Sequence, residues 1–241
     1  MSLHVEVTGI KELQDELNKI KNQGAVVDAL NHTVSGARIR VRNVMDQVFS
    51  PKAHPYVKDG IRTETADIVH LRATVYISEF ASGKAGLSPA QILAPHIFGG
   101  GRLPKASERS LRAWYSDVFS YGQFLTPGPG AARDAYGNIS GQEMIKIKSG
   151  AGISEKGNAY KMNITPRSKK RNKKAYGNLF VSPRVGVFRR LGPNSVIPVL
   201  FFSRPPVYRK RFPFYETVRE HAQKTFLKNM IQALGFRTGR R

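Results

Sequence analysis

Apolar residues recur at alternating spacings of three and four along about twenty residues in the N-terminal part of the chain. They are Val27, Leu30, Val34, Ala37, Val41, Val44 and Val48. Because this spacing places all of them on one side of an α-helix, it predicts an amphipathic helix over about 25–49. Pro51 is expected to end this helix. Such a helix must bury its apolar side against other elements of the same fold.

A second amphipathic helix is predicted near the C-terminus, over about 214–234. Its apolar stripe consists of Tyr215, Val218, Ala222, Phe226, Met230 and Leu234, and Gly235 follows as a C-cap. Shorter helices are predicted at 106–119 and at 141–148, where Ser140 and Glu143 fit a capping box. The spacing of Ile10, Leu13, Leu17 and Ile20 predicts a further helix.

Strands are predicted where apolar and polar residues alternate. This pattern is short at 3–8 and long at 68–78. Two β-rich segments, 178–188 and 196–202, are joined by turn residues at 191–195 and predict a hairpin. Pro183 and Pro198 indicate edge strands or bulges, because proline donates no ladder hydrogen bond. The segments 91–104 and 126–141 are rich in glycine and proline and predict loops.

Together these patterns predict an α+β fold. A small antiparallel sheet, built from 68–78, 178–188 and 196–202, is expected to pack against the long helix and the C-terminal helix. We expect a single domain over 1–241, with a loop-rich insertion at about 81–160 and a basic arm at about 165–175. The Gly/Pro-rich loops suit contacts with neighbouring subunits, which would supply the burial that the loops lack alone.

Positive charge is concentrated in the C-terminal part of the chain. The net charge is +22, and residues 141–241 hold 23 Lys and Arg against 4 Asp and Glu. Residues 1–140 hold 16 against 13. This imbalance predicts a polyanionic or acidic partner for one side of the protein.

Three basic groups are candidates for that contact. The first group is Arg167, Lys169, Lys170, Arg171, Lys173 and Lys174, which form either a solvated loop or a polybasic arm on phosphate or an acidic protein surface. The second is Arg204, Arg209, Lys210 and Arg211, in a segment whose aromatics either contact a partner or insert into the core. The third is Arg38, Arg40 and Arg42, which form either a solvated helix face or a lining that faces DNA in a channel.

No motif for catalysis is found in the sequence. The six histidines have no metal-binding spacing, there is no H-E-x-x-H, and the carboxylates form no paired signature. The chain has no cysteine, no P-loop and no G-x-S-x-G, and Gly99–Gly101 is typical of a flexible turn. We therefore expect no enzymatic activity, no metal and no cofactor. The N-terminal segment does not fit a signal peptide, and no apolar run approaches the roughly 20 residues of a membrane helix.

Several segments, in the same order, resemble a known family. They are the opening Val7, Gly9, Ile10, Lys11, Glu12 and Leu13, then 94–112, then Asp134–Gln142, then Pro198–Phe202, and finally Tyr208–Tyr215 before the last helix. This ordered set resembles the head–tail joining and tail-completion proteins of tailed bacteriophages, in the group of minor tail protein Z. The shared segments are packing and loop motifs, so the resemblance implies no active-site residue.

The resemblance implies a virion protein of the neck or upper tail that is assembled in the host cytoplasm. Such proteins form homo-oligomeric rings, commonly hexamers, around the channel that DNA crosses. The implied partners are further copies of the chain and neighbouring connector, tail-terminator or tail-tube proteins, with genomic DNA as a further candidate. The region 81–160 makes this chain longer than the shorter members.

Two rival hypotheses remain open on the residues alone. A non-specific nucleic-acid-binding protein would explain the charge, and its binding would weaken steeply with salt. An enzyme acting on nucleic acid would need a metal cluster that the sequence pattern does not contain. Ring formation distinguishes the joining protein from both.

Overall fold

The structure, a computed structural model, describes residues 4–7, 22–81, 86–114, 119–151 and 165–237. The chain forms two compact units. Unit 1 comprises residues 1–100 and 208–241, and unit 2 comprises residues 101–207. Each unit has its own hydrophobic core. Unit 2 is therefore inserted between the two stretches of chain that make up unit 1.

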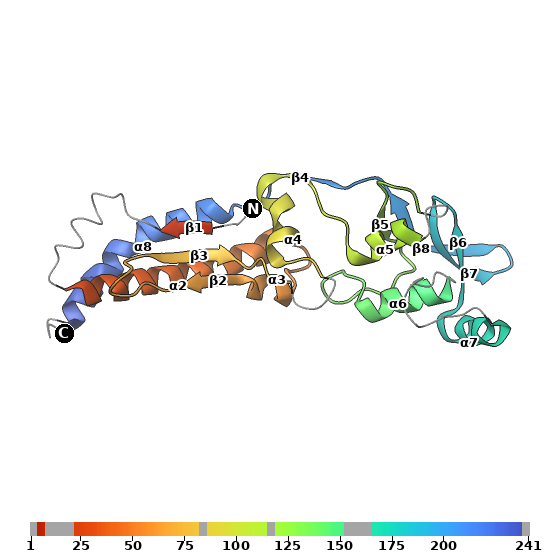
Figure 1. The fold of residues 1–241 in the computed structure, drawn as a ribbon, viewed down its shortest axis with the longest axis horizontal. Helices are drawn as coiled ribbons and strands as arrows, with labels where there is room; N and C mark the ends of the chain where they lie inside the picture. Colours follow the sequence, from red (N-terminus) through yellow and green to blue (C-terminus); the bar gives the residue numbers. More distant parts are fainter. Residues whose placement is uncertain (1–3, 8–21, 82–85, 115–118, 152–164, 238–241) are drawn as a thin grey trace. The chain divides into compact units, whose positions relative to one another are not determined.

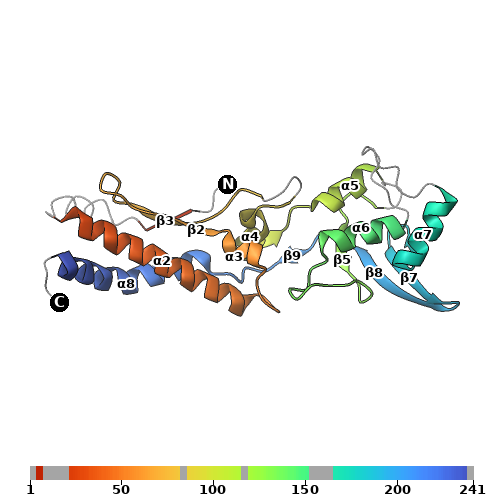
Figure 2. The ribbon, with the colours of Figure 1, turned by 90° about the horizontal axis from the view of Figure 1, so that it is seen from below.

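Two long helices dominate unit 1 and confirm the two predicted amphipathic helices, although the C-terminal helix continues to Arg237, past the cap predicted at Gly235. Helix α2 (Gln23–Val48) packs against helix α8 (Phe214–Arg237), and the two lie side by side in Figures 1 and 2. They approach closely where α2 has no side chain, because a Cβ at Gly36 would lie 2.6 Å from Nε2 of His221. Asn229 Nδ2 donates a hydrogen bond to Thr33 Oγ1 across the helix pair, at 2.9 Å.

The helix pair carries a three-stranded antiparallel sheet. Its strands are β1 (His4–Val7), β2 (Ile61–Glu64) and β3 (Ala73–Ile77), in the order β1-β3-β2. The predicted strands at 3–8 and 68–78 correspond to β1 and β3. The strand β3 starts later than predicted because Asp67 Oδ1 accepts hydrogen bonds from the backbone of Val69 and His70 and closes a turn. The side chains of Ile68 and Val69 are exposed there.

Two short helices complete unit 1. Helix α3 (Pro55–Asp59) lies ahead of β2, and helix α4 (Pro89–Phe98) follows β3. The loop predicted at 91–104 is thus largely wrong. Ser88 and Gln91 form a full capping box, which pairs backbone N–H groups that have no partner within the helix. A proline in the first turn also suits a helix start.

Unit 2 is built on a four-stranded antiparallel sheet. Its strands are β5 (Phe124–Pro127), β6 (Asn178–Ser182), β7 (Gly186–Gly192) and β8 (Ser195–Ser203), in the order β5-β8-β7-β6. Its helices are α5 (Ala106–Trp114), α6 (Gly141–Gly150) and α7 (Pro166–Tyr176). Leu111 of α5 and Ile147 of α6 join the sheet's buried side chains in one core. Helix α6 confirms the prediction at 141–148, with Ser140 Oγ accepting a hydrogen bond from Glu143 N.

The α+β class is confirmed, but the predicted sheet is wrong in composition. The segment 68–78 belongs to the sheet of unit 1, whereas 178–188 and 196–202 belong to that of unit 2. The segment 178–188 is also two strands, because the chain turns between Ser182 and Gly186, where Arg184 has a positive φ. The hairpin between β7 and β8 is confirmed.

Pro198 produces the bulge that its residue type predicts. Phe188 pairs with Pro198 and Val187 with Leu200, so Val199 is an extra residue in an interior strand. The carbonyl groups of Pro198 and Val199 accept hydrogen bonds from Gly130 N and Gly128 N. Strand β8 therefore tolerates a proline although strands flank it on both sides.

The division into two units differs from the single domain expected from the sequence. The inserted segment is 101–207 rather than a loop-rich region at about 81–160. The chain passes between the units at Gly100–Gly101 and at Val207–Tyr208, where strands β4 and β9 pair with each other. Because both passages are two-residue strands rather than polar linkers, the sequence carries no boundary signal. The pattern of Ile10, Leu13, Leu17 and Ile20 lies outside the described residues.

Candidate polyanion-binding surface

The basic segment of unit 2 forms a helix instead of a projecting arm. Helix α7 begins at Pro166, which suits a first helical position, and it packs against α6 and β6. Its exposed basic residues are Arg167, Lys170, Arg171, Lys173 and Lys174, and the side chain of Lys169 lies outside the described part. The expectation of an arm or loop at 165–175 is therefore corrected, because packing on two neighbours fixes this segment.

The charges on α7 repel one another. Arg167 and Arg171 are four residues apart, as are Lys170 and Lys174. Like charges at this spacing destabilise a helix by a few tenths of a kcal/mol per pair, and roughly 0.3 kcal/mol is typical. A bound polyanion would remove this repulsion. The helix is thus a surface on which anion binding and helix stability favour each other.

No acidic residue lies nearby in the sequence to neutralise this surface. Residues 156–215 contain 15 Lys and Arg and no Asp or Glu. In the described part of unit 2, the ion pairs join Arg102 to Glu108 and Lys146 to Glu143. Both carboxylates lie before the acid-free segment in the sequence. Each is already paired with a cation other than those of α7.

The second basic group divides between the two units. Arg204 is exposed in unit 2, whereas Arg209, Lys210 and Arg211 belong to unit 1. The aromatics of this segment insert into the core: Phe212 and Phe214 are fully buried. Of the two alternatives left open by the sequence, the structure thus places these rings in the core.

Two of the basic side chains in that segment have partners in unit 1. Lys210 Nζ lies 2.9 Å from Glu216 Oε1. Arg211 Nε donates to His96 Nδ1 at 3.1 Å, and its guanidinium lies 4.8 Å from the ring centroid of Phe49. Burial, together with the nearby charge of Arg211, lowers the pKa of His96 to about 4. His96 is therefore neutral at pH 7 and accepts this hydrogen bond.

The three arginines of α2 do not share one face. Arg38 Nε donates to the carbonyl of Ile61 at 3.0 Å. Arg42 Nε donates to the carbonyl of Lys58 at 3.0 Å, and its Nη2 lies 3.3 Å from Asp59. Arg40 is exposed. Burial, and then the positive charge of Arg40, lowers the pKa of His221 on α8. Arg38 and Arg42 thus hold β2 and the end of α3 against α2.

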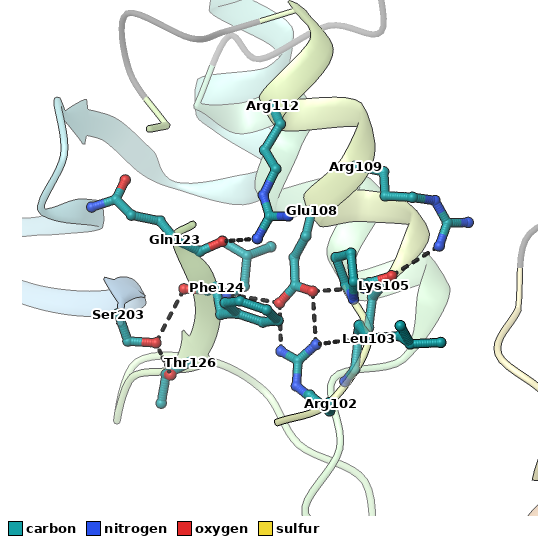
Figure 3. A network of polar contacts seen from close by, with 12 residues as sticks. Arg102, Leu103, Lys105, Glu108, Arg109, Arg112, Gln123, Phe124, Thr126 and Ser203 are labelled. Carbon is teal, nitrogen blue, oxygen red and sulfur yellow. Dashed lines mark hydrogen bonds and ion pairs between the residues drawn. The ribbon is translucent and has the colours of Figure 1, made fainter. Parts of the chain in front are cut away.

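A buried ion pair that the sequence patterns do not reveal organises the start of unit 2 (Figure 3). The side chain of Glu108, in the first turn of α5, has no exposed surface. Its oxygens accept hydrogen bonds from Arg102 Nη1 and Nη2 and from the backbone N–H groups of Lys105 and Leu125. The sequence signal for this contact is the position of Glu108, three residues after Lys105, which precedes the helix. A glutamate at this position can accept a hydrogen bond from the backbone N–H at the helix start.

The electrostatics of Glu108 identify it as a structural group. Burial acts to raise the pKa of this carboxyl, but the hydrogen bonds and charge of Arg102 and the two backbone N–H groups outweigh burial and lower it. The guanidinium groups of Arg102 and Arg112 both lie over the ring of Phe124, at 4.6 and 4.9 Å from its centroid. With both oxygens occupied and no access for solvent, Glu108 fixes α5 to β5.

Within the described ranges, no group of three or more His, Asp or Glu side chains is arranged to hold a metal ion. None of the helices in those ranges is long and apolar enough to cross a membrane. Comparisons of the chain with the models of known protein families, with curated proteins and with solved structures find no match.

Proposed function

We propose that this chain is a structural virion protein of a tailed bacteriophage, located in the neck or upper tail. There it joins head to tail, or completes the tail, as a homo-oligomeric ring around the DNA channel. The starting point is the resemblance of its ordered segments to head–tail joining and tail-completion proteins. Its role is assembly rather than catalysis, with further copies of itself and connector, tail-terminator or tail-tube proteins as partners.

The observation that carries the proposal is a second apolar side on helix α8. One side of α8 buries Val218 and Met230 in the core of unit 1. Leu227 and Ile231, one turn apart, are nevertheless 68% and 62% exposed. A helix that is apolar on two sides is typical of an element with a partner on each. A neighbouring copy of the chain would cover these side chains in a ring.

The charge distribution fits a channel-lining or connector-facing unit. Unit 2 holds 19 Lys and Arg against 5 Asp and Glu, whereas unit 1 holds 20 against 12. The excess in unit 2 includes the exposed residues of α7. Genomic DNA and an acidic neighbouring protein are the two partners that such a surface would attract.

The test is the native mass of the full chain by light scattering at low and high salt. We expect a discrete multiple of the 26.8 kDa chain mass. High salt should not dissociate this assembly, because an apolar contact does not depend on charge. Leu227→Gln should reduce the assembly to single chains, since it buries an amide without a partner at the contact.

Leu191→Gln is the matched control, because Leu191 lies in unit 2 and is 64% exposed, nearly as much as Leu227. This variant should keep the mass of the unmodified protein. A single chain at every salt concentration, both alone and in the presence of purified phage tails that lack the protein, would contradict the ring.

The exposed cations of α7 favour a second candidate, a non-specific nucleic-acid-binding protein. Such a protein would bind duplex DNA as a single chain, and its affinity would fall steeply as salt rises. Replacing Lys170, Lys173 and Lys174 with glutamine should reduce the salt slope by about 0.9 for each phosphate that the protein no longer neutralises. Lys210→Gln is the control, because Lys210 is already paired with Glu216. Assembly without any DNA affinity would exclude this candidate.

A further inference from the structure

The sheet of unit 2 has one face that its core does not use. Strand residues alternate between the faces, and the core takes Leu179, Val187, Leu200 and Phe202. Phe180, Phe188, Arg190, Val196 and Phe201 alternate with them on the other side, and we call this set the aromatic face. Val196 is 48% and Phe201 38% exposed, whereas Phe180 and Phe188 are half-buried. The face therefore presents apolar rings to solvent.

Two of these rings form an ordered pair. Phe180 of β6 and Phe188 of β7 are direct cross-strand partners. Their ring centroids are 5.8 Å apart and their planes are inclined by 23°, so the rings are stacked. Such pairs hold both rings in a defined orientation. The rings are thus fixed in place before any ligand binds.

An arginine is fixed beside this pair. The guanidinium of Arg190 lies 5.5 Å from the ring centroid of Phe180. Its Nη1 also donates to the carbonyl of Pro193, at 3.0 Å. That bond uses one of the five N–H groups of the guanidinium. A cation held next to stacked rings combines a charge for phosphate with a platform for a flat ring.

We propose that the aromatic face binds single-stranded nucleic acid. A single strand exposes the faces of its bases, which stack on aromatic side chains, and its phosphates attract arginine. In a duplex the bases stack on one another and are not free to lie on the rings. The whole face falls within the acid-free segment 156–215, so no carboxylate on these strands repels a phosphate. This proposal is separate from the ring, and its test does not depend on the oligomeric state.

The same observations argue against other occupants. A second copy of this face would bring two acid-free, cationic surfaces together, and like charges oppose that contact. An acidic protein segment would use the arginine but would gain little from the ring pair. Competition with poly-glutamate tests the acidic segment. A face covered by a second copy would leave single-strand binding unchanged in Phe188→Leu.

The experiment is fluorescence anisotropy of the full chain with a labelled thymidine oligonucleotide of about 15 nucleotides, near the upper end of single-strand site sizes. A duplex of the same length is the comparison, and poly-glutamate is the competitor. We expect tighter binding of the single strand. Phe188→Leu and Phe180→Leu keep the apolar bulk but remove the ring, and each should weaken single-strand binding about tenfold. Phe188→Tyr should retain binding, and thermal unfolding of every variant checks that it folds.

Arg190 and Arg189 offer a matched pair of charge changes. Arg189 pairs with Leu179 and so lies on the side of the core, whereas Arg190 lies on the aromatic face. Both Arg190→Gln and Arg189→Gln remove one positive charge, but Arg190→Gln should weaken binding more. Equal reductions in affinity would overturn the proposal. Equal affinity for the duplex and the single strand, with both affinities unchanged in Phe188→Leu, would also overturn it. So would displacement by poly-glutamate that is as effective as displacement by unlabelled thymidine oligonucleotide.

Discussion

The carboxylate of Glu108 accepts two hydrogen bonds from the guanidinium of Arg102, over 2.5 and 2.8 Å, inside unit 2. Glu108 also accepts the backbone N–H of Leu125, which belongs to strand β5. One buried carboxylate therefore connects the segment before α5, the start of α5 and the edge strand of the sheet. Each of these elements is short, so the ion pair adds a polar connection to the few apolar contacts that each can make.

Glu108→Gln should destabilise unit 2. The change leaves the guanidinium of Arg102, which is only 13% exposed, without its counter-charge. Removing one partner from a buried ion pair typically costs about 3 kcal/mol. Urea unfolding followed by circular dichroism would measure this cost. Glu143→Gln is the control, because its pair with the half-exposed Lys146 is longer, at 3.6 Å, and should contribute little.

His96 should make unit 1 sensitive to mild acid. Its pKa is about 4 in the fold, because of burial and then of Arg211, against an ordinary value of 6.5. Below pH 6.5 the unfolded chain takes up a proton that the folded chain takes up only near pH 4. The stability that neutral His96 contributes is therefore lost progressively between pH 6.5 and 4.

Two measurements check this prediction. An NMR titration of the His96 ring should give a midpoint near 4, and Arg211→Met should raise it, because the neighbouring positive charge is gone. In His96→Gln the loss of stability between pH 6.5 and 4 should be smaller than in the unmodified protein. A midpoint near 6.5 would show that the imidazole is not buried as described.

Gly186→Ala should destabilise the sheet of unit 2. A Cβ at Gly186 would collide with the backbone carbonyl oxygen of Leu200 on the neighbouring strand. Because a backbone atom cannot move aside as a side chain does, we expect the free energy of unfolding to fall by about 2 kcal/mol. Gly192→Ala is the matched control on the same strand, since no heavy atom lies within 4 Å of a Cβ there. Thermal unfolding of the two variants should separate them clearly.

Phe212→Ala should act on unit 1 alone. Phe212 is fully buried in the core of unit 1, and truncating such a ring costs about 3 kcal/mol. Hydrogen exchange read by mass spectrometry should accelerate in α2 and α8 and stay unchanged in β6, β7 and β8. Leu200→Ala should give the reverse pattern, because Leu200 belongs to the core of unit 2. Equal acceleration in both units would contradict two separate cores.

The elements that can be predicted from the sequence are those with local signals. The periodic stripe of α2, the stripe of α8, the cap at Ser140 and the turn between β7 and β8 each depend on residues near in the chain. The bulge at Val199 follows from Pro198 for the same reason. Each of these features appears in the structure close to its predicted position.

The predictions that are wrong concern partners distant in the chain. Alternation identifies a strand such as β3 but not its neighbours, so the sequence patterns cannot separate the strands of the two sheets. The basic residues 167–174 have no apolar periodicity, yet they form helix α7, which packs on α6 and β6. Arg38 and Arg42 fit a solvated or DNA-facing surface by sequence, because their carbonyl partners at Ile61 and Lys58 follow much later.

The insertion of unit 2 between the two stretches of unit 1 has a consequence for synthesis on the ribosome. Helix α2 emerges early, whereas its partner α8 emerges only after all of unit 2. Because domains tend to fold as units during translation, unit 2 can close its core while the apolar stripe of α2 still waits for a partner. A nascent chain that stalls before Phe214 would hold every residue of unit 2 and only an incomplete unit 1.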